Sequence, residues 1–437
     1  MVHLTKHSTA RAVSLALALL ALPSVAFAGN EEGVLFGAEA SLNAGAVTAT
    51  TSEGSALWYN PAGIADVANN RLDVSGSVFM LRAHHVGAFL IAPGDGSAPA
   101  TISEIVSIPA AATYVRRLGS RVHLGAGVFV PSHTDYTLRA SYTTRSGSQW
   151  VNNETVLDDD THAGVGLGIE ITPTLRLGAS LFGIYQSSSG SLQFIGGTDS
   201  ATTGDSFESI SSIHSFRAVS LQAGVGVQWA PIASLRVGLA IRSPAVEIYE
   251  GADVTEVRTS AGAMTPASFT PATSSSGAFG LGVTAPLKVR AGVAWVGERA
   301  SVSIDADVAP ALRPANDDPR SFNWNVRVGG RFRLRELFTL GAGLFTDRSP
   351  YRDAQVSGER RLDFYGATVG VEFGNALTVV NAPAPRITFT TTLALRYAYG
   401  SGEVDAMQVD AMNRISVVSS PITVHEIGVN VGSGLRF

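Results

Sequence analysis

The chain ends in Ile427-Gly428-Val429-Asn430-Val431-Gly432-Ser433-Gly434-Leu435-Arg436-Phe437. Apolar residues take alternate positions in this stretch, with only Ser433 breaking the series, and Gly, Asn and Arg fill the other positions. A period of two predicts a strand with one apolar and one polar face. A final strand of this kind that closes on Phe is typical of bacterial outer-membrane barrels, although a soluble sandwich can also end on a strand.

Alternating stretches recur along the whole chain, and we count about fourteen, an even number as in bacterial single-chain barrels. They lie at about 72–82, 108–117, 121–131, 162–171, 174–186, 217–229, 234–243, 286–296, 300–309, 322–334, 337–347, 361–373, 386–399 and 424–437. No apolar run after residue 28 is long enough for a membrane helix, so only strands could span a bilayer here.

The connections between these stretches alternate in length. Tight turns such as Leu118-Gly119-Ser120 and Gly297-Glu298-Arg299 alternate with longer polar connections, among them 132–161, 187–216 and 244–285. Short turns on one rim and long connections on the other predict a membrane barrel whose short-turn rim faces the periplasm.

Aromatic residues support the same topology. Several strands carry an aromatic near their short-turn end, in phase with the Leu, Val and Ile of the same strand; these are Tyr114, Trp229, Trp295, Phe332, Phe373 and Phe437. Aromatics at one common depth form the interfacial girdle of a membrane barrel.

The first residues resemble a secretory signal. Lys6 and Arg11 precede an apolar stretch at 12–22, and the small residues that end at Ala28 predict cleavage after that position. The chain has no cysteine, which excludes a disulfide framework and thiolate chemistry. Its formal net charge of −5 argues against nucleic acid as a partner.

The face opposite the apolar one is rich in glycine and carries patterned charges. Small inward residues leave room in the lumen or let another piece of chain pack against the wall. The inward cations include Arg236, Arg242, Lys288, Arg290 and Arg327, whereas Asp305 and Asp307 are the inward acids among the same strands. The cations therefore outnumber the acids, and we expect them either to brace the barrel or to bind an anionic ligand head, with Arg290 and Arg327 the first candidates.

The segment before the first strand contains Trp58-Tyr59-Asn60-Pro61-Ala62-Gly63-Ile64-Ala65. Asn-Pro followed by Gly is a turn signal on local chemistry alone. The string resembles the N-terminal signature of the FadL/TodX-type outer-membrane transporters, which carry long-chain fatty acids and other hydrophobic compounds. The upstream Leu42-Asn43-Ala44-Gly45-Ala46 departs from the pattern usual in that family, and its acidic pair is reduced to Glu53.

The resemblance implies an all-β, transmembrane antiparallel barrel of about fourteen strands with an N-terminal hatch, or plug, inside it. The chain then divides into a signal peptide (1–28), a hatch (29–70) with the motif Asn60, Pro61, Ala62 and Gly63, and a barrel (71–437). The resemblance also implies a lateral exit at a kinked third strand. Here that strand holds Gly125, Gly127 and Pro131, which weaken or interrupt a ladder, although Pro131 could instead end the strand.

We therefore expect a protein of the bacterial outer membrane that takes up hydrophobic compounds by diffusion through a hatch-plugged barrel. The alternatives are a general diffusion porin and a structural or adhesive barrel. No motif points to an enzyme, a cofactor or a metal site. The expected partners are outer-membrane lipid and lipopolysaccharide, a hydrophobic small molecule, and the barrel-assembly machinery through Phe437; we expect a monomer.

Overall fold

The computed structural model describes residues 33–92, 94–145, 147–198, 206–262, 265–313, 319–351, 359–378, 386–409 and 415–437. The expected signal peptide and the first residues of the expected hatch lie outside these ranges. Among the described residues, no helix is both long and apolar enough to cross a membrane.

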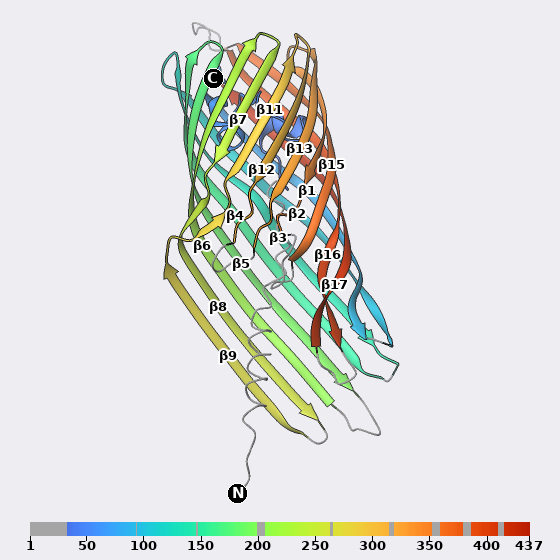
Figure 1. Ribbon diagram of the computed structural model, residues 1–437. Helices are drawn as coiled ribbons and strands as arrows, with labels where there is room; N and C mark the ends of the chain where they lie inside the picture. Colours follow the sequence, from blue (N-terminus) through green and yellow to red (C-terminus); the bar gives the residue numbers. More distant parts are fainter. Residues whose placement is uncertain are drawn as a thin grey trace.

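Fourteen strands form a closed antiparallel ring, as predicted (Figure 1). The ring runs from β1 to β7, continues with β11 to β17, and closes where β17 pairs with β1 from Arg71↔Arg436 to Val86↔Ile422. The ring strands are β1 (Arg71–Ala92), β2 (Gly96–Arg117), β3 (Val122–Thr143), β4 (Gln149–Thr172), β5 (Leu175–Thr198), β6 (Ser206–Ile232), β7 (Leu235–Arg242), β11 (Lys288–Val296), β12 (Ala300–Ala309), β13 (Asn323–Arg335), β14 (Phe338–Asp347), β15 (Glu359–Thr378), β16 (Arg386–Val409) and β17 (Ile415–Arg436).

Three further strands extend the sheet on one side. β8 (Ala245–Gly262) continues the line of β7 after Ser243 and Pro244, because β6 pairs with β7 over its last residues and with β8 over its first. β9 (Thr265–Phe279) returns along β8, and the short β10 (Val283–Ala285) leads back into the ring. These strands and the neighbouring long strand ends form what we call the extension, the part of the barrel farthest from the tight turns (Figure 1).

The expectation of long polar connections at 132–161, 187–216 and 244–285 is wrong in one respect. These segments continue largely as paired strands, for example from Ser132↔Asp160 to Thr143↔Gln149. The outward positions of this pair are mostly polar, among them Asp135, Thr137, Arg139 and Ser141 on β3, so the outward apolar row that marks a membrane strand is missing while the backbone ladder persists.

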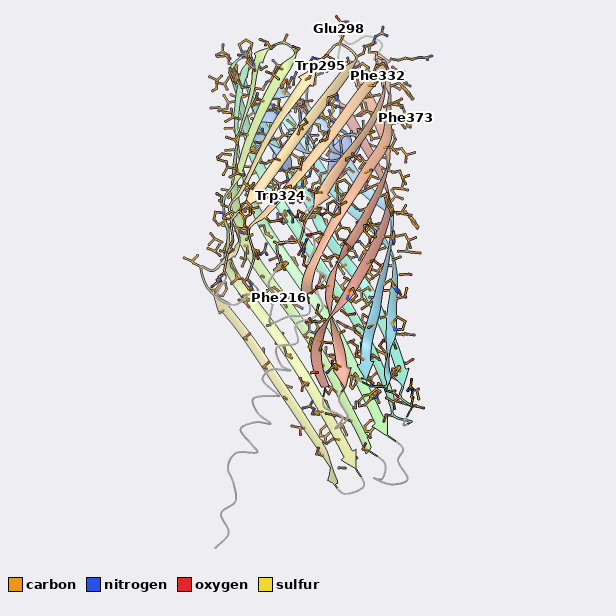
Figure 2. All side chains as sticks on the ribbon, turned by 45° about the vertical axis from the view of Figure 1, so that its right-hand side comes forward. Phe216, Trp295, Glu298, Trp324, Phe332 and Phe373 are labelled. Carbon is orange, nitrogen blue, oxygen red and sulfur yellow. The ribbon has the colours of Figure 1, made fainter. Side chains whose placement is uncertain are left out.

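The tight turns lie where predicted and define the short-turn rim. Trp295, Phe332 and Phe373 are 52, 45 and 46% exposed and lie close to this rim, which Glu298 marks in Figure 2. On β13 the outward row extends from Phe332 to Trp324, which lies farther from the rim (Figure 2). At about 3.4 Å per residue and a tilt of about 40°, that row covers roughly 20 Å along the membrane normal, close to the apolar band about 25 Å tall of such barrels.

Within the described residues before β1, three short helical segments lie inside the ring. They are α2 (Gly37–Leu42), α3 (Ala56–Tyr59) and the 3-10 helix η1 (Pro61–Asp66), drawn in blue in Figure 1 near the short-turn rim. Their apolar side chains are buried, including Phe36, Leu57 and Ile64. The barrel lumen at this level is therefore filled by the chain itself.

If the exposed apolar face of the ring lies in lipid, the cost of an outward-facing charge to folding stability should depend strongly on its position along the barrel. An arginine in place of Leu239, which faces outward on β7, should lower the free energy of unfolding by about 2–4 kcal/mol, because the guanidinium would lie in lipid. The matched control is Ile213→Arg, on an outward position of β6 within the extension. Urea unfolding in lipid vesicles measures both, and equal costs would contradict the membrane placement.

Candidate functional site

Glycines on the inner face of the ring are the contact points for the segment before β1, which we call the hatch (described residues 33–70). A Cβ added at Gly178 would overlap the Pro61 carbonyl, and one at Gly238 would overlap the Thr48 carbonyl. A Cβ at Gly168, Gly226, Gly329 or Gly341 would overlap other hatch atoms, which belong to Ala65, the Asn60 side chain, Asn43 and Leu42 respectively. The absence of side chains on the wall lets hatch backbone lie directly on strand backbone.

The Asn60 motif joins the hatch to the wall. The Asn60 side chain accepts a hydrogen bond from Ala62 N at 3.1 Å and so caps η1, with Pro61 at its first position. The Asn60 amide also donates to the carbonyl oxygens of Thr48 at 2.8 Å and Val227 on β6 at 3.0 Å. The predicted turn is therefore the start of a helix, and one side chain fixes both its geometry and its attachment.

Ion pairs between hatch acids and wall cations hold the hatch at several points. Asp66 lies 2.7 Å from Arg176 and 3.0 Å from Arg236. Burial raises the pKa of Asp66 above its usual value, and the two guanidinium groups oppose that rise. Removing the Asp66 carboxylate would leave two cations of the wall without this partner.

A second ionic contact is fully enclosed. Glu53 of the hatch pairs with Arg71 at 2.9 Å, and Arg71 pairs with Asp73 at 2.7 Å, both at the start of β1. The backbone N–H of Gly54 donates to Asp73 at 2.9 Å, and the backbone N–H groups of Val47 and Thr48 both donate to Asp305 on β12 at 2.8 Å. Carboxylates of the barrel thus accept hydrogen bonds from hatch backbone N–H groups, while carboxylates of the hatch form ion pairs with barrel arginines.

The structure brings together three of the five nominated cations. Lys288, Arg290 and Arg327 surround Asp307, with Lys288 at 3.8 Å, Arg290 at 3.9 Å and Arg327 in direct contact. The other two lie elsewhere, because Arg236 pairs with Asp66 and Arg242 donates to the Trp58 carbonyl. The expected excess of positive charge is reduced but not removed, because the hatch supplies acids such as Asp66 for Arg236 and Glu39 for Arg331, while Lys288, Arg290 and Arg327 share Asp307.

An aromatic cluster lies where the hatch meets β3 and β5. Trp58 packs edge-on against Phe36 with ring centroids 4.9 Å apart, and the rings of Phe129 and Phe182 lie 5.4 and 5.9 Å from it. The Arg242 guanidinium lies 3.9 Å from the centroid of the Trp58 ring. Sequence reasoning missed this cluster, although Phe129 and Phe182 are aromatic residues at inward positions among glycines.

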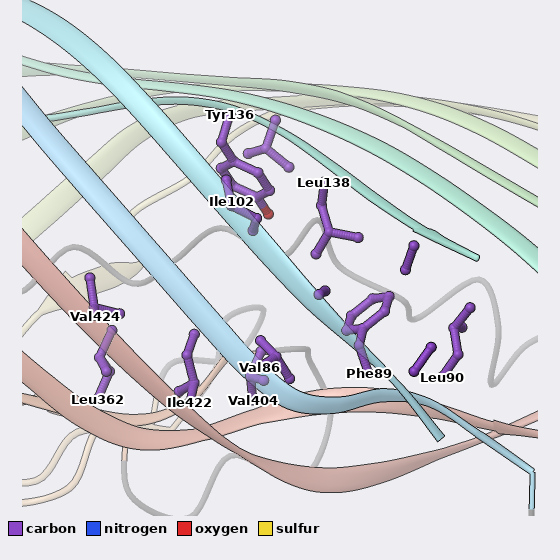
Figure 3. Close-up of a cluster of buried hydrophobic side chains, with 14 of the residues drawn as sticks. Val86, Phe89, Leu90, Ile102, Tyr136, Leu138, Leu362, Val404, Ile422 and Val424 are labelled. Atoms are coloured by element: carbon purple, nitrogen blue, oxygen red, sulfur yellow. The ribbon is translucent and has the colours of Figure 1, made fainter. Parts of the chain in front are cut away.

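A second apolar cluster lines the inside of the extension (Figure 3). Its members come from strands on both sides of the closing seam; they include Val86, Phe89, Ile102, Tyr136, Leu138, Val404 and Ile422. Ala44 of the hatch belongs to the same cluster. An apolar lining therefore reaches from the extension to the hatch.

The third strand continues through Pro131 and does not end there. Its pairing with β4 slips between Phe129 and Ser132, so Phe129 and Tyr136 both face inward despite opposite parity. Its pairing with β2 stops at Ala111↔Phe129, and the same register continued by two residues would place Pro109 opposite Pro131. Neither proline has an N–H to donate, so the β2–β3 ladder ends at this point.

The two nominated glycines lie on the paired part of this strand. A Cβ at Gly125 would lie 3.3 Å from Ile64 of the hatch, and one at Gly127 would press on Thr113 of β2 at 2.7 Å. Among the described residues, no group of three or more His, Asp or Glu could hold a metal ion.

Comparison with solved structures finds the same architecture. A Pseudomonas aeruginosa FadL homologue matches with a TM-score of 0.61 at 12% identity, covering 93% of this chain and 99% of that chain. The Pseudomonas putida toluene transporter TodX matches with a TM-score of 0.57 at 15% identity (93 and 99% covered). The Ralstonia pickettii toluene transporter TbuX matches at 0.56 and 13% identity (94 and 99%).

No family model and no curated protein sequence matches the chain. At these identities, the structural likeness establishes the fold: a fourteen-stranded barrel of the kind seen in FadL-like proteins.

Because the hatch packs closely on the wall, adding one methyl group should destabilise the fold at an inward glycine that touches the hatch but not at one that does not. Gly178→Ala should lower the free energy of unfolding by about 1–3 kcal/mol, because the methyl must displace Pro61. Gly428→Ala is the matched control, since its nearest atoms would lie at 3.8 Å, and should change stability by less than about 0.5 kcal/mol. Urea unfolding measures both; equal values would mean that the hatch does not rest on the wall at Gly178.

Proposed function

We propose that this protein is an outer-membrane transporter of the FadL/TodX type, which takes up hydrophobic compounds such as long-chain fatty acids or hydrocarbons. The observation that carries the proposal is a barrel whose lumen is filled by its own hatch and whose approach to that hatch is apolar. A general diffusion porin needs an open, polar lumen. A purely adhesive barrel gives the buried apolar lining no role.

In this proposal the extension captures the ligand. Its inner cluster offers aliphatic and aromatic side chains, including Phe89, Ile102 and Leu138, to a molecule that leaves water (Figure 3). Burial of apolar ligand surface drives this step at about 25 cal/mol per Å². The ligand then moves along the lining toward Ala44 and the aromatic cluster at Trp58.

The exit in this proposal is lateral, through the wall between β2 and β3. Beyond Ala111↔Phe129 these strands share no ladder, so an opening there breaks no backbone hydrogen bonds between them. By contrast, the path straight through the barrel is closed by hatch backbone packed on glycines and held by ion pairs. Lateral exit would release an apolar compound into the membrane.

An anionic ligand head is assigned to Arg290 and Lys288. Both lie at the longer distances from Asp307, and the Arg290 guanidinium lies 5.4 Å from the ring centroid of Tyr59 in the hatch. A ligand carboxylate could replace Asp307 as a partner of these two cations. Arg327 is fully buried against Asp307, and Arg236 and Arg242 hold the hatch, so these three act as braces.

The proposed setting is the bacterial outer membrane, with the short-turn rim in the periplasm and the extension among lipopolysaccharide. The outward apolar face and the girdle at Trp295, Phe332 and Phe373 support it. Assembly would depend on recognition of the last strand and Phe437 by the barrel-assembly machinery. The proposed unit is a monomer without catalytic function.

Flux through vesicles that contain the purified protein tests the function. A labelled long-chain fatty acid and a neutral alkane should enter several-fold faster than in protein-free vesicles, and a hydrophilic sugar should not. Rapid sugar flux would identify a porin. Absence of both fluxes, with the barrel folded, would leave a structural role.

The head-group assignment predicts a substrate-dependent effect. Arg290→Gln should slow fatty-acid flux about tenfold, the loss expected for one charge-assisted hydrogen bond, and leave alkane flux nearly unchanged. Arg236→Gln, which removes a brace on Asp66, is the matched control and should not discriminate between the two ligands. An equal loss for both ligands in the Arg290 variant would instead make that residue a brace.

The lateral exit predicts that closing the ladder slows release. The double change Pro109→Val and Pro131→Val supplies the two missing donors and should extend β2–β3 pairing, which lowers flux while ligand still binds. Pro421→Val, on β17 opposite Glu403 in the extension, is the control. Flux that is unchanged in the double variant, with extended pairing verified by hydrogen exchange, would exclude this exit.

A further inference from the structure

An open groove crosses the outward face of the ring from β1 to β6. Its volume is about 550 Å³. Small residues contribute to its floor at Ala112, Ala126, Ala163 and Gly183, and larger apolar residues line it from Leu72 to Leu221. Most of these positions alternate with inward residues, so the groove lies on the outer side of the wall, although Thr113, Gly127 and Gly164 of the inward parity also line it.

The groove runs obliquely. Strand register links Leu72 to Tyr114, Tyr114 to Ala126, and onward across β4 and β5. Leu72 is the second residue of β1, at the short-turn rim, whereas Leu221 lies well inside the 27-residue β6. Five strand spacings of about 4.8 Å give a length of roughly 24 Å. A leaflet is roughly 15 Å of a hydrocarbon core about 30 Å thick, so the groove suits one acyl chain lying at a slant.

A basic turn lies at the rim end of this groove. The end of β2 and the turn to β3 read Arg116-Arg117-Leu118-Gly119-Ser120-Arg121, with three arginines and no acid. All three arginines are exposed, and Arg116 shares the outward face with Ala112 and Tyr114 of the groove. Within the described ranges, neither Arg116 nor Arg121 has an ion-pair partner. Arg117 shapes the turn, because its side chain donates to the Gly119 carbonyl at 2.8 Å.

The depth of these charges matches a lipid head group. Tyr114 belongs to the girdle and is a groove residue, and the turn begins two residues beyond it toward the rim. Arginine binds phosphate oxygens by paired, charge-assisted hydrogen bonds. An apolar groove that ends in unpaired arginines at the interface is complementary to a molecule with an acyl chain and an anionic head.

We propose that this groove and turn form a binding site for an anionic phospholipid of the periplasmic leaflet. One acyl chain lies over Ala112, Ala126 and Ala163, and the phosphate binds Arg116 and Arg121. The site rests on the membrane placement proposed above and is independent of which compound the barrel transports.

Native mass spectrometry of protein released from nanodiscs tests the site. The nanodiscs contain equal amounts of phosphatidylglycerol and phosphatidylethanolamine. The unaltered protein should retain one phosphatidylglycerol about tenfold over phosphatidylethanolamine. Arg116→Gln with Arg121→Gln should abolish this preference and still retain lipid. Ala126→Phe, which fills the groove from its lipid side, should abolish retention of either lipid.

The matched control is Arg333→Gln with Arg335→Gln, exposed arginines at the rim of β13 away from the groove, which should retain phosphatidylglycerol like the unaltered protein. Each variant is first shown to be folded by its heat-modifiable migration in gels. The proposal is overturned if the unaltered protein releases without lipid or without preference, if the Arg116/Arg121 variant keeps the preference, or if the groove is covered by a second copy in a stable dimer. Added palmitate that displaces the phospholipid at equal concentration would also overturn it, because the groove would then hold cargo.

Discussion

The structure depends on one steric condition, the absence of side chains where the hatch touches the wall. Strands present alternate residues to the lumen, so a glycine at every second position of a strand gives a bare backbone surface. Gly178 and Gly238 face hatch carbonyls that any Cβ would strike. Large inward residues at these places would push the hatch out of the lumen, and an open channel would remain.

Electrostatics then fix the hatch in the position that this packing allows. The wall offers cations to Asp66 and Glu53 of the hatch, and Asp305 of the wall accepts two hatch N–H groups. Breaking a buried pair by removing one partner costs about 3–5 kcal/mol, so several such contacts make displacement of the whole hatch unfavourable. A compound that enters such a lumen leaves most readily where the wall itself is weak, and the β2–β3 ladder is interrupted at Pro131.

Local patterns predicted the ring well, because membrane strands must alternate and short turns carry clear signals. The strand number and the positions of Trp295, Phe332 and Phe373 follow from period and parity alone. The extension could not be predicted in this way, since the outward positions of its strands are largely polar and lack the apolar row of a membrane strand. The contribution of the hatch to the charge balance could not be predicted for another reason: Asp66 meets Arg176 and Arg236 only after folding, across a sequence separation that no local pattern reports. The end of the β2–β3 ladder near Pro131 could not be predicted from the proline alone, because it depends on the register of β2 and β3.

The most direct test of the account is single-channel conductance in planar bilayers, with the intact protein compared with a variant that lacks residues 33–67. If the hatch fills the lumen, the intact protein should be nearly silent, and the shortened protein should conduct in large, stable steps while still migrating as a folded barrel. Large conductance in the intact protein, or silence in both with the barrel folded, would contradict a lumen closed by its own N-terminal segment.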